Sequence, residues 1–472
     1  MDFINEILDK LNGYLYGYIL IALLILAGLY FTIRTKFIQF RLIGESIALL
    51  REKNDNKEAV SSFQALMIST ASRVGVGNIA GVATAIAIGG AGSVFWMWVM
   101  ALVGAASALI ESTLAQVYKI KSAGNEFRGG PAYYIERALN RRWLGILFSI
   151  MLIACFAYGF NGLQANNIVS SLAHYFGGNF NSMLIPGIVG AILALGTAYV
   201  IYGGQEKIAF MTSVIVPIMA VMYLVLGIIV IARNISALPG VFVAIFRGAF
   251  DFEAIFGGFA GSAVVMGIKR GLFSNEAGMG SAPNAAASAH VSHPVKQGLV
   301  QMLSVFIDTL LICSATAFII LVSGIDTTGL KAMPLVQAAI SSQFGEAGIF
   351  FITLSVFFFA FSSIIGNYYY TESNMLFILG KKTSLKIFRL SVVIAVFLGS
   401  IAGYDLVWNL ADVLMGFMAM INIGVILVLS TPAVKTVDDY VAQKKEGKDP
   451  AFIAEEVGIY NTDLWKKESI LN

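Results

Sequence analysis

Long apolar stretches dominate this sequence and restrict it to one class of fold. A helix needs about 20 apolar residues to cross a hydrocarbon layer of about 30 Å, and eleven stretches meet that requirement. We predict spans at Tyr14–Ile33, Phe63–Gly89, Phe95–Tyr118, Trp143–Leu172, Met183–Tyr202, Ile208–Ala232, Phe256–Ala287, Gly298–Val322, Gly348–Leu379, Ile387–Ala402 and Leu406–Ser430. Charged residues make up only 12% of the chain, whereas soluble domains contain about 25%. Because backbone groups in lipid must be hydrogen-bonded within their own segment, we predict an all-α polytopic membrane protein.

The positions of lysine and arginine predict how the chain crosses the membrane. If the residues after Ile33 are cytoplasmic, 24 of the 31 basic residues lie inside and 4 outside, and the other three, Arg73, Lys269 and Arg270, lie within spans. Basic residues collect on the cytoplasmic side. We therefore expect a multi-pass protein of the cell membrane, with its N-terminus outside and its C-terminus in the cytoplasm. Membrane lipid is an expected partner, and the net charge of +3 is too small to predict nucleic acid as another.

The spans after the first divide into two groups of five. We predict an N-terminal helix and cytoplasmic linker at 1–62, five-helix repeats at 63–232 and 256–430, and a cytoplasmic tail at 431–472. Because five is an odd number, the two repeats must cross the membrane in opposite orientations, which is the inverted-repeat topology of secondary transporters. Each repeat begins with its most glycine-rich span, and we expect both of these helices to be broken near the midplane.

Three further segments are expected at the membrane surface. Pro131–Asn140 and Leu238–Phe250 are too short or too polar to span, and their patterns favour interfacial helices. The connection at 323–347 is rich in turn-forming residues and is long enough to act as an external lid.

The stretch 69–80, in the first repeat, carries the strongest chemical pattern. Gly75-x-Gly77-x-x-Ala80 matches a dinucleotide fingerprint, but that motif requires a preceding β-strand, which a membrane span cannot supply. Two glycines and Asn78 weaken a helix, and unwinding would free amides to bind a carboxylate and carbonyls to bind a cation. Close helix packing through small residues is the alternative, although packing would not require Asn78 or Arg73.

Charged residues within other spans are further candidates. Lys269, Arg270 and Glu276 are costly in a membrane and indicate function. If the helix ends near Met266, they would instead form a cap at the inner surface. Two more carboxylates within spans are candidate ion or structural partners: Glu111 and Asp308.

Amides and hydroxyls in two later spans are the remaining candidate binding groups. Gln164 and Asn167 share a helix face because of their i,i+3 spacing. Ser362 and Ser363 offer paired hydroxyl oxygens that suit Na⁺, although serine in a membrane helix often bonds back to its own turn.

Several motifs in consistent order resemble those of one family. They are Gly89–Trp98, Val74–Asn78, Arg128–Ala132, Gln164–Asn166, Leu272–Ser281, and Phe361–Ser363 with Asn367 and Tyr368. The chain is similar in these motifs to the alanine or glycine:cation symporters, also called sodium:alanine symporters. The resemblance implies a leucine-transporter-type fold of ten core helices in inverted repeats, preceded here by one extra helix.

The resemblance also assigns roles to individual residues. It implies that the amides of Val76 and Gly77 bind the substrate carboxylate. The whole implied substrate site is Thr70, Ala71, Gly75, Val76, Gly77, Asn78, Gln164, Ile268, Gly271 and Phe273. The implied sodium site consists of the carbonyls of Ala71 and Val74 and the hydroxyls of Ser362 and Ser363. Arg73 departs from the small or hydroxyl residue expected at its position, where the wider fold can hold a second sodium ion.

These observations predict a sodium-coupled symporter of small neutral amino acids, alanine or glycine, that works by alternating access. Na⁺ is the expected coupling ion, and no other cofactor is implied. The charge-coupling candidates are Arg73, Glu276 and Asp308, and we expect Arg73 to pair with one of the two carboxylates. A proton-coupled carrier that uses Glu276 or Asp308 is the alternative. A membrane-embedded enzyme would need a catalytic cluster, and no HExxH or comparable paired-acid motif occurs in the spans.

Overall fold

Helices form almost the whole of the computed structural model, which describes residues 2–52, 60–122, 126–177, 183–251, 262–380 and 385–467. Within these residues, β1 (Ile120–Lys121) and β2 (Phe127–Arg128) form a short antiparallel hairpin in which Ile120 pairs with Arg128. Apart from this hairpin, the structure confirms the predicted helical class.

Eight helices in the described part of the chain are long and apolar enough to cross a membrane. They are Phe3–Arg34, Gly92–Val117, Arg142–Phe176, Leu184–Ile201, Lys207–Arg233, Pro294–Val322, Ala332–Leu379 and Tyr404–Val428. A ninth span results if the bent pair Ser62–Arg73 and Gly77–Gly89 is counted as one. Two of the eleven predicted spans remain: α21 (Leu385–Ile401) has only 17 residues, and residues 252–261 lie outside the described part.

The first helix is longer than predicted. α1 (Asp2–Tyr14), the π-helical η1 (Leu15–Ile19) and α2 (Leu20–Arg34) follow one another without a gap, whereas the sequence predicted a span only from Tyr14 to Ile33. The acidic residues of α1 hid the helix, because an amphipathic helix needs only one apolar face.

The part of the chain predicted as the first repeat contains two segments of π-helix. Its elements are α5 (Ser62–Arg73), η2 (Gly77–Gly81, π), α6 (Val82–Gly89), α7 (Gly92–Val117), α8 (Pro131–Leu139), α9 (Arg142–Ile153), η3 (Ala154–Phe160, π), α10 (Asn161–Ser171), α11 (Ala173–Phe176), α12 (Leu184–Ile201) and α13 (Gln205–Arg233). α8 is one of the two helices predicted at the membrane surface.

The part predicted as the second repeat follows a linker of η5 (Ile235–Ala237) and α14 (Leu238–Ala249), the other helix predicted at the surface. Its elements are α16 (Ala263–Asn275), α17 (Pro283–Ala286), α18 (Pro294–Phe306), η7 (Ile307–Cys313, π), α19 (Ser314–Val322), α20 (Ala332–Leu379), α21 and α22 (Tyr404–Val428). The loop predicted at 323–347 is wrong from Ala332 onward, because α20 begins there. Non-helical dihedral angles at Gly345 (φ 58°, ψ −143°) interrupt α20 near the end of the expected loop.

α7 is the central helix of the structure, and small residues let its neighbours approach it closely. A Cβ atom at Gly298 of α18 would lie 2.3 Å from Thr113 Oγ1, and one at Gly267 of α16 would lie 2.4 Å from the Ser93 carbonyl oxygen. Such contacts stabilise helix pairs in lipid through van der Waals packing.

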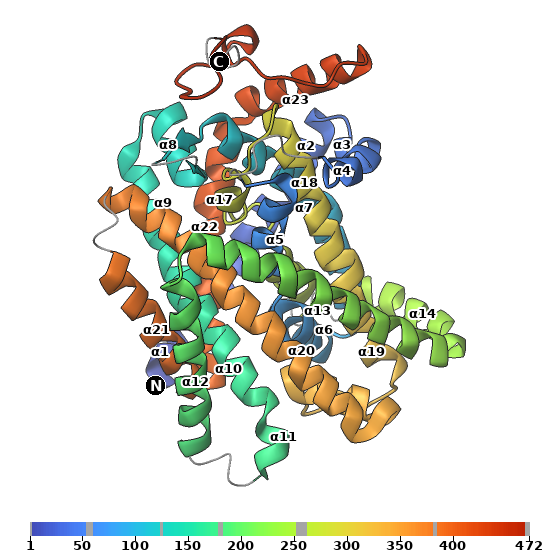
Figure 1. Ribbon diagram of the computed structural model, residues 1–472. Coiled ribbons are helices and arrows are strands. Elements are labelled where there is room, and N and C mark those ends of the chain that lie inside the picture. Colours follow the sequence, from blue (N-terminus) through green and yellow to red (C-terminus); the bar gives the residue numbers. More distant parts are fainter. Residues whose placement is uncertain are drawn as a thin grey trace.

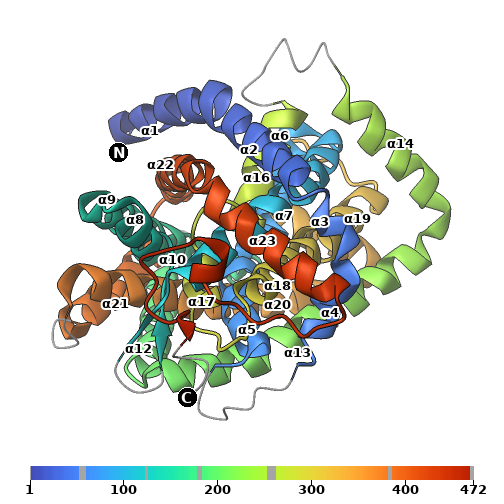
Figure 2. The same cartoon turned by 90° about the horizontal axis from the view of Figure 1, so that it is seen from above.

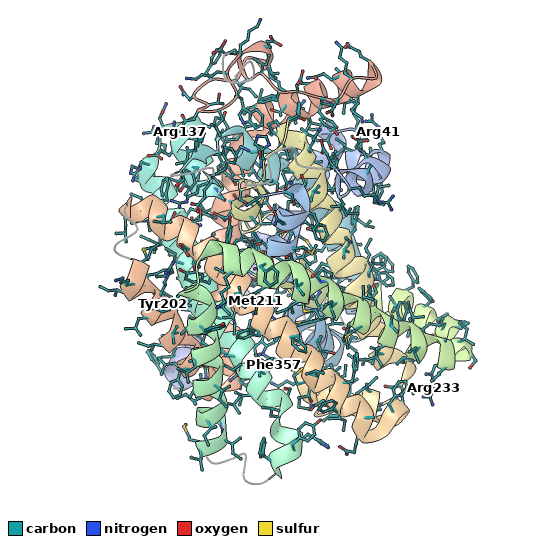
Figure 3. The ribbon with its side chains drawn as sticks, viewed as in Figure 1. Arg41, Arg137, Tyr202, Met211, Arg233 and Phe357 are labelled. Atoms are coloured by element: carbon teal, nitrogen blue, oxygen red, sulfur yellow. The ribbon has the colours of Figure 1, made fainter. Side chains whose placement is uncertain are left out.

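The C-terminal segment covers one end of the helices. α3 (Ile38–Arg41), α4 (Ile43–Leu49), α8, α23 (Ser430–Lys445) and the tail with η9 (Glu455–Val457) lie together at the top of Figure 1. Seen from above in Figure 2, α23 crosses over the region of α7 and α18. Arg41 and Arg137, both predicted to be cytoplasmic, lie at this end in Figure 3, whereas Arg233, predicted to be outside, lies far from them.

Candidate functional site

The break between α5 and η2 forms the centre of the candidate site. α5 begins with a capping box at Ser61 and ends at Arg73, and the next helical stretch departs at an angle of 52°. The chain between them turns at Val74 (ψ 85°), and the Asn78 side chain accepts a hydrogen bond of 3.0 Å from the Gly75 amide. The sequence placed a break here from its glycines and Asn78.

Three of the four oxygens expected to bind sodium come together at this break. The Ser363 Oγ atom on α20 lies 2.9 Å from the Ala71 carbonyl oxygen and 3.3 Å from that of Val74. Ser362 makes different contacts, because its hydroxyl donates to the Phe359 carbonyl of its own turn at 3.0 Å and lies 3.7 Å from the sulfur of Met219.

α20 passes unusually close to α5 beside these oxygens. A Cβ atom at Gly366 would lie only 2.6 Å from the backbone nitrogen of Ser72. A larger residue would therefore separate the two helices and move Ser363 away from the α5 carbonyls.

Two residues of the predicted substrate site bind each other in this structure. The Val76 amide donates to Gln164 Oε1 on α10 at 3.0 Å. A Cβ atom at Gly75 would lie 2.7 Å from Gln164 Nε2 and 2.3 Å from Ser363 Oγ. Gly75 thus lies between the oxygen cluster and the predicted substrate site, and only glycine fits there.

Phe273 forms the wall opposite the break, whereas Gly271 does not face it. The Phe273 ring lies 3.0 Å from where a Gly77 Cβ atom would be, and its edges contact the rings of Phe160 and Trp408. A Cβ atom at Gly271 would meet Met100 of α7 at 3.2 Å. That side of α16 packs against α7, and a contact of Gly271 with the substrate stays a prediction.

The predicted substrate residues are all buried. Thr70 is the most exposed of the non-glycine members, at 8%, and Ile268 and Gln164 are exposed by 1% and 2%. The site is therefore closed in this conformation.

Asn78 and Asp308 join the broken helix to η7. The Asn78 amide donates to Asp308 Oδ1 at 2.7 Å, and the hydroxyls of Ser274 and Thr309 lie 2.7 and 3.0 Å from Oδ2. The Thr316 hydroxyl donates to the Asn78 carbonyl at 2.6 Å. Because these bonds and the Gly75 amide engage its side chain and carbonyl, Asn78 holds the break in place.

Glu276 joins the other side of the break to the end of α16. It caps α16 in a left-handed conformation (φ 54°). Its Oε1 lies 2.9 Å from the hydroxyl of Ser72, and its Oε2 accepts from Ser281 at 2.6 Å.

The expected ion pair of Arg73 is not formed. Its guanidinium donates to the Ser304 hydroxyl and, at 3.4 Å, to the Gln301 carbonyl of α18. Among the described residues it forms no ion pair, and its Nε and second terminal nitrogen are buried without hydrogen-bond partners. The prediction of a direct carboxylate partner is wrong, because Asp308 and Glu276 are already engaged by neutral donors.

An ion cluster that the sequence did not reveal lies at Lys269 and Arg270 of α16. Arg270 forms two hydrogen bonds of 2.9 Å with the carboxylate of Asp412 on α22, and Lys269 lies 2.6 Å from the same carboxylate. The hydroxyl of Tyr16 on η1 donates to the Asp412 carbonyl at 3.0 Å. The alternative of a helix end near Met266 is wrong, because α16 continues to Asn275. An acidic residue within the apolar stretch 406–430 was the available signal.

Glu111 has a structural contact that its sequence position did not reveal. Its two carboxylate oxygens accept from the amides of Gly278 (3.2 Å) and Gly280 (3.0 Å), and Asn422 donates to it at 2.7 Å. Both glycines have positive φ. Glu111 therefore fixes the loop that follows Glu276.

Known proteins of one kind match nearly the whole chain. A family profile described as "Sodium:alanine symporter family" matches residues 1–454. "Amino-acid carrier protein AlsT" of Bacillus subtilis is 48% identical over 468 residues, which cover 99% of each chain. "Probable sodium/glutamine symporter GlnT" of the same organism is 45% identical and covers 95% of this chain and 93% of its own. "Sodium/alanine symporter AgcS" of Methanococcus maripaludis is 37% identical, over 91% of this chain and 95% of its own.

Proposed function

We propose, since the chain belongs to the sodium:alanine symporter family, that it couples the entry of Na⁺ to the uptake of a small neutral amino acid, alanine or glycine. The family consists of carriers and not of enzymes. One observation carries the sodium assignment: the Ala71 and Val74 carbonyls and the Ser363 hydroxyl lie together where α5 ends.

The oxygen cluster has the chemistry that Na⁺ requires. Carbonyl and hydroxyl oxygens are hard ligands, and discontinuous helices in transporters coordinate Na⁺ through freed carbonyls. The Ser363 hydroxyl can rotate and present a lone pair to an ion in place of its hydrogen. Na⁺ at this point would attach α20 to the end of α5, and so attach the second repeat to the first.

The same break offers a substrate site next to the ion. A substrate carboxylate would replace Gln164 at the Val76 amide, with the Gly77 amide beside it. Ala71 and Val74 are less than two helical turns from Val76, so an ion that orders their carbonyls also orders the amides. The ion gradient then drives uptake because Na⁺ favours one of two conformations.

The wall opposite the break favours a small side chain. Phe273 is held between Phe160 and Trp408, so it cannot withdraw without moving both aromatic neighbours. Ile268, on the same helix, is fully buried. A methyl group or a hydrogen fits such a pocket, and we therefore propose alanine or glycine over the larger glutamine.

A proton-coupled carrier is the second candidate, and one observation favours it. Glu276 and Asp308 contact Ser72 and Asn78 on the two sides of the break. Protonation of either carboxylate would therefore change the hydrogen bonding of the segment that is proposed to bind substrate.

Uptake of labelled alanine into proteoliposomes decides between the two couplings. We expect an inward Na⁺ gradient to drive accumulation that survives a protonophore, and an inward proton gradient without Na⁺ to drive none. Accumulation driven by protons alone would contradict the proposal. In the same assay, unlabelled glycine should compete with alanine, whereas leucine and glutamine should compete weakly; equal competition by glutamine would refute the small pocket.

A further inference from the structure

The docked tail, residues 439–465, lies against the end of the helices that is predicted to be cytoplasmic. Three of its aromatic side chains are buried there: Tyr440 and Phe452 completely, and Trp465 with 6% exposed. The Trp465 indole nitrogen donates to the Gln116 carbonyl of α7 at 2.8 Å. Buried aromatic side chains contribute much of the energy of an interface. The docked tail is therefore held on the helices by packing as well as by hydrogen bonds.

Ser292 and His293, directly before α18, are the main contacts of the docked tail. The Phe452 amide donates to the Ser292 carbonyl at 3.0 Å, and the Ser292 hydroxyl donates to the Pro450 carbonyl at 2.8 Å. The His293 ring is fully buried, and the ring centroids of Tyr440 and Phe452 lie 5.0 and 5.1 Å from its own. The docked tail thus fixes the chain where it enters α18.

Two segments lead from these contacts to the transport site. One is the connection 276–293, which begins at Glu276, and Glu276 contacts Ser72 beside the break. The other is α5, because the residues before it are bonded to the same connection: the His290 amide donates to the Val60 carbonyl at 3.0 Å. Val60 lies two residues before α5, and the far end of α5 is the break itself. Movement of either segment therefore disturbs the contacts of the docked tail.

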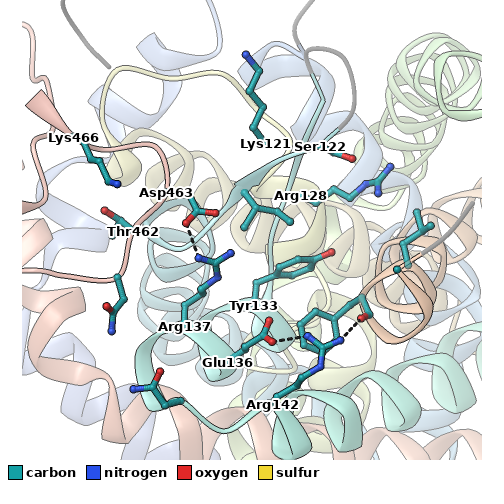
Figure 4. A pocket seen from close by; sticks show the side chains of 16 residues that line it. Lys121, Ser122, Arg128, Tyr133, Glu136, Arg137, Arg142, Thr462, Asp463 and Lys466 are labelled. Carbon is teal, nitrogen blue, oxygen red and sulfur yellow. Dashed lines mark hydrogen bonds and ion pairs between the residues drawn. The ribbon is translucent and has the colours of Figure 1, made fainter. Parts of the chain in front are cut away.

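The charged contacts of the docked tail are weak enough to break and form again. Lys296 of α18 pairs with Asp449 at 2.9 Å, and Arg137 of α8 pairs with Asp463 at 2.5 Å (Figure 4). The two acidic side chains are 76% and 38% exposed. Ion pairs with an exposed partner contribute little. The buried aromatic side chains therefore provide most of the docking.

We propose that the docked tail is an autoinhibitory segment, which holds α5 and the connection 276–293 closed over the transport site until its release lets the site open toward the cytoplasm. The inference rests on the proposed function, because a carrier has to expose one site to the two sides of the membrane in turn. The predicted substrate residues are buried while the tail is docked. The rate of uptake then depends on how often the tail is released.

The test uses the full-length protein and releases the tail by substitution. Phe452→Ala removes a fully buried ring of the docked tail. Tyr460→Ala is the matched control, because it removes an aromatic ring of the same tail that is 70% exposed. Asp449→Asn is a second, milder variant, because it removes the ion pair with Lys296 and leaves the aromatic packing intact. The rate of trypsin cleavage at the lysines of 444–448 reports tail release in each protein.

Opening of the site is measured without substrate, by the rate at which N-ethylmaleimide modifies Cys313. Cys313 is buried beside the break, with its sulfur 3.3 Å from Asn78 Nδ2. Cys155, the other cysteine of the chain, is replaced by alanine in every protein. We expect Phe452→Ala to raise the rate of modification and the initial rate of Na⁺-driven alanine uptake about threefold or more. Asp449→Asn should raise both rates less, and Tyr460→Ala should change neither.

Several results would overturn the proposal. If Phe452→Ala releases the tail and Cys313 reacts no faster, the tail does not hold the site closed. If neither variant releases the tail, or if Tyr460→Ala has the same effect as Phe452→Ala, the contacts described above do not control it. A fall in uptake without a change in Cys313 reactivity would show that the tail only supports the fold. Faster modification of Cys313 with no alanine uptake by any protein, the wild type included, would support the autoinhibitory contact and contradict the proposed function.

Discussion

Replacing Ser363 with alanine tests the sodium site most directly. The change removes one of three oxygens that converge at the end of α5, and the other two are backbone carbonyls that no substitution can remove. A hydrogen bond or ligand contact to a charged group contributes about 1.5–3 kcal/mol. The sodium concentration for half-maximal alanine uptake should therefore rise about 10- to 150-fold.

Ser362→Ala is the matched control for this prediction. It removes the same hydroxyl from the neighbouring position, but that hydroxyl bonds to its own turn and faces Met219. We expect its sodium dependence to change less than about twofold, because a bond within a helical turn is worth little. Initial uptake rates in proteoliposomes at fixed alanine and varied Na⁺ measure both variants. If the two variants shift equally, or if Ser363→Ala does not shift, the assignment of the ion to this cluster is wrong.

Three further predictions concern other parts of the molecule. Gly77→Val should abolish alanine binding, measured by scintillation proximity, because its Cβ atom alone would lie 3.0 Å from the Phe273 ring; retained binding would refute the substrate site. Asp412→Asn leaves two buried cations without their carboxylate and should lower the unfolding temperature in detergent, with part of the loss recovered by adding Lys269→Met. Burial lowers the pKa of Lys119 from 10.5 to about 7, so the folded state binds fewer protons between pH 7 and 10.5 and the packing around Lys119 should strengthen as the pH rises through that range. Limited proteolysis of the tail should be faster at pH 6 than at pH 9, and Lys119→Met should reduce the difference.

The sequence predicted the spans and the break because both depend on local composition. Apolar length determines which segments can cross a membrane, and the glycines with Asn78 weaken the helix wherever it packs. The count of eleven spans stays a prediction, because α21 is short and residues 252–261 lie outside the described part. Local composition also did not show that α1 continues the first helix with polar residues. Local composition also concealed the helix that begins at Ala332, since its first residues follow a polar loop.

The two serines show what the sequence could not determine. Neighbouring residues on a helix point about 100° apart, so Ser362 and Ser363 face different directions, and in this structure Ser363 is the one that contacts the α5 carbonyls. Which of them does so depends on the rotation of α20, which is set by its approach to α5 at Gly366. That approach is a tertiary contact across almost 300 residues of sequence.

Charged residues within the spans were recognised as important. The partner expected for Arg73 was wrong, and the partner of Lys269 and Arg270 was not foreseen. A buried charge must be stabilised, and this rule alone predicted a carboxylate for Arg73. In the structure, the carboxylate of Asp412 pairs with Lys269 and Arg270. Asp412 lies 142 residues from Arg270 in the sequence. Sequence distance contains no information about such pairs.

The arrangement of Arg73 offers a physical reason for cation coupling. Arg73 shares the buried region around the break with three carboxylates, Glu111, Glu276 and Asp308, and it forms no ion pair with them among the described residues. Each carboxylate accepts hydrogen bonds from amides or hydroxyls, which favour its ionised form, whereas its burial favours the neutral form. A cation bound nearby stabilises whichever of these carboxylates is ionised. The Ala71 and Val74 carbonyls, which Ser363 contacts, flank Ser72 and Arg73 in the chain. This cluster of oxygens offers Na⁺ a place near the carboxylates, whereas a proton would have to bind a carboxylate directly. We therefore expect removal of the Ser363 hydroxyl to weaken coupling by Na⁺ and to leave coupling by protons unchanged, so the two mechanisms predict different results for the loss of this one atom.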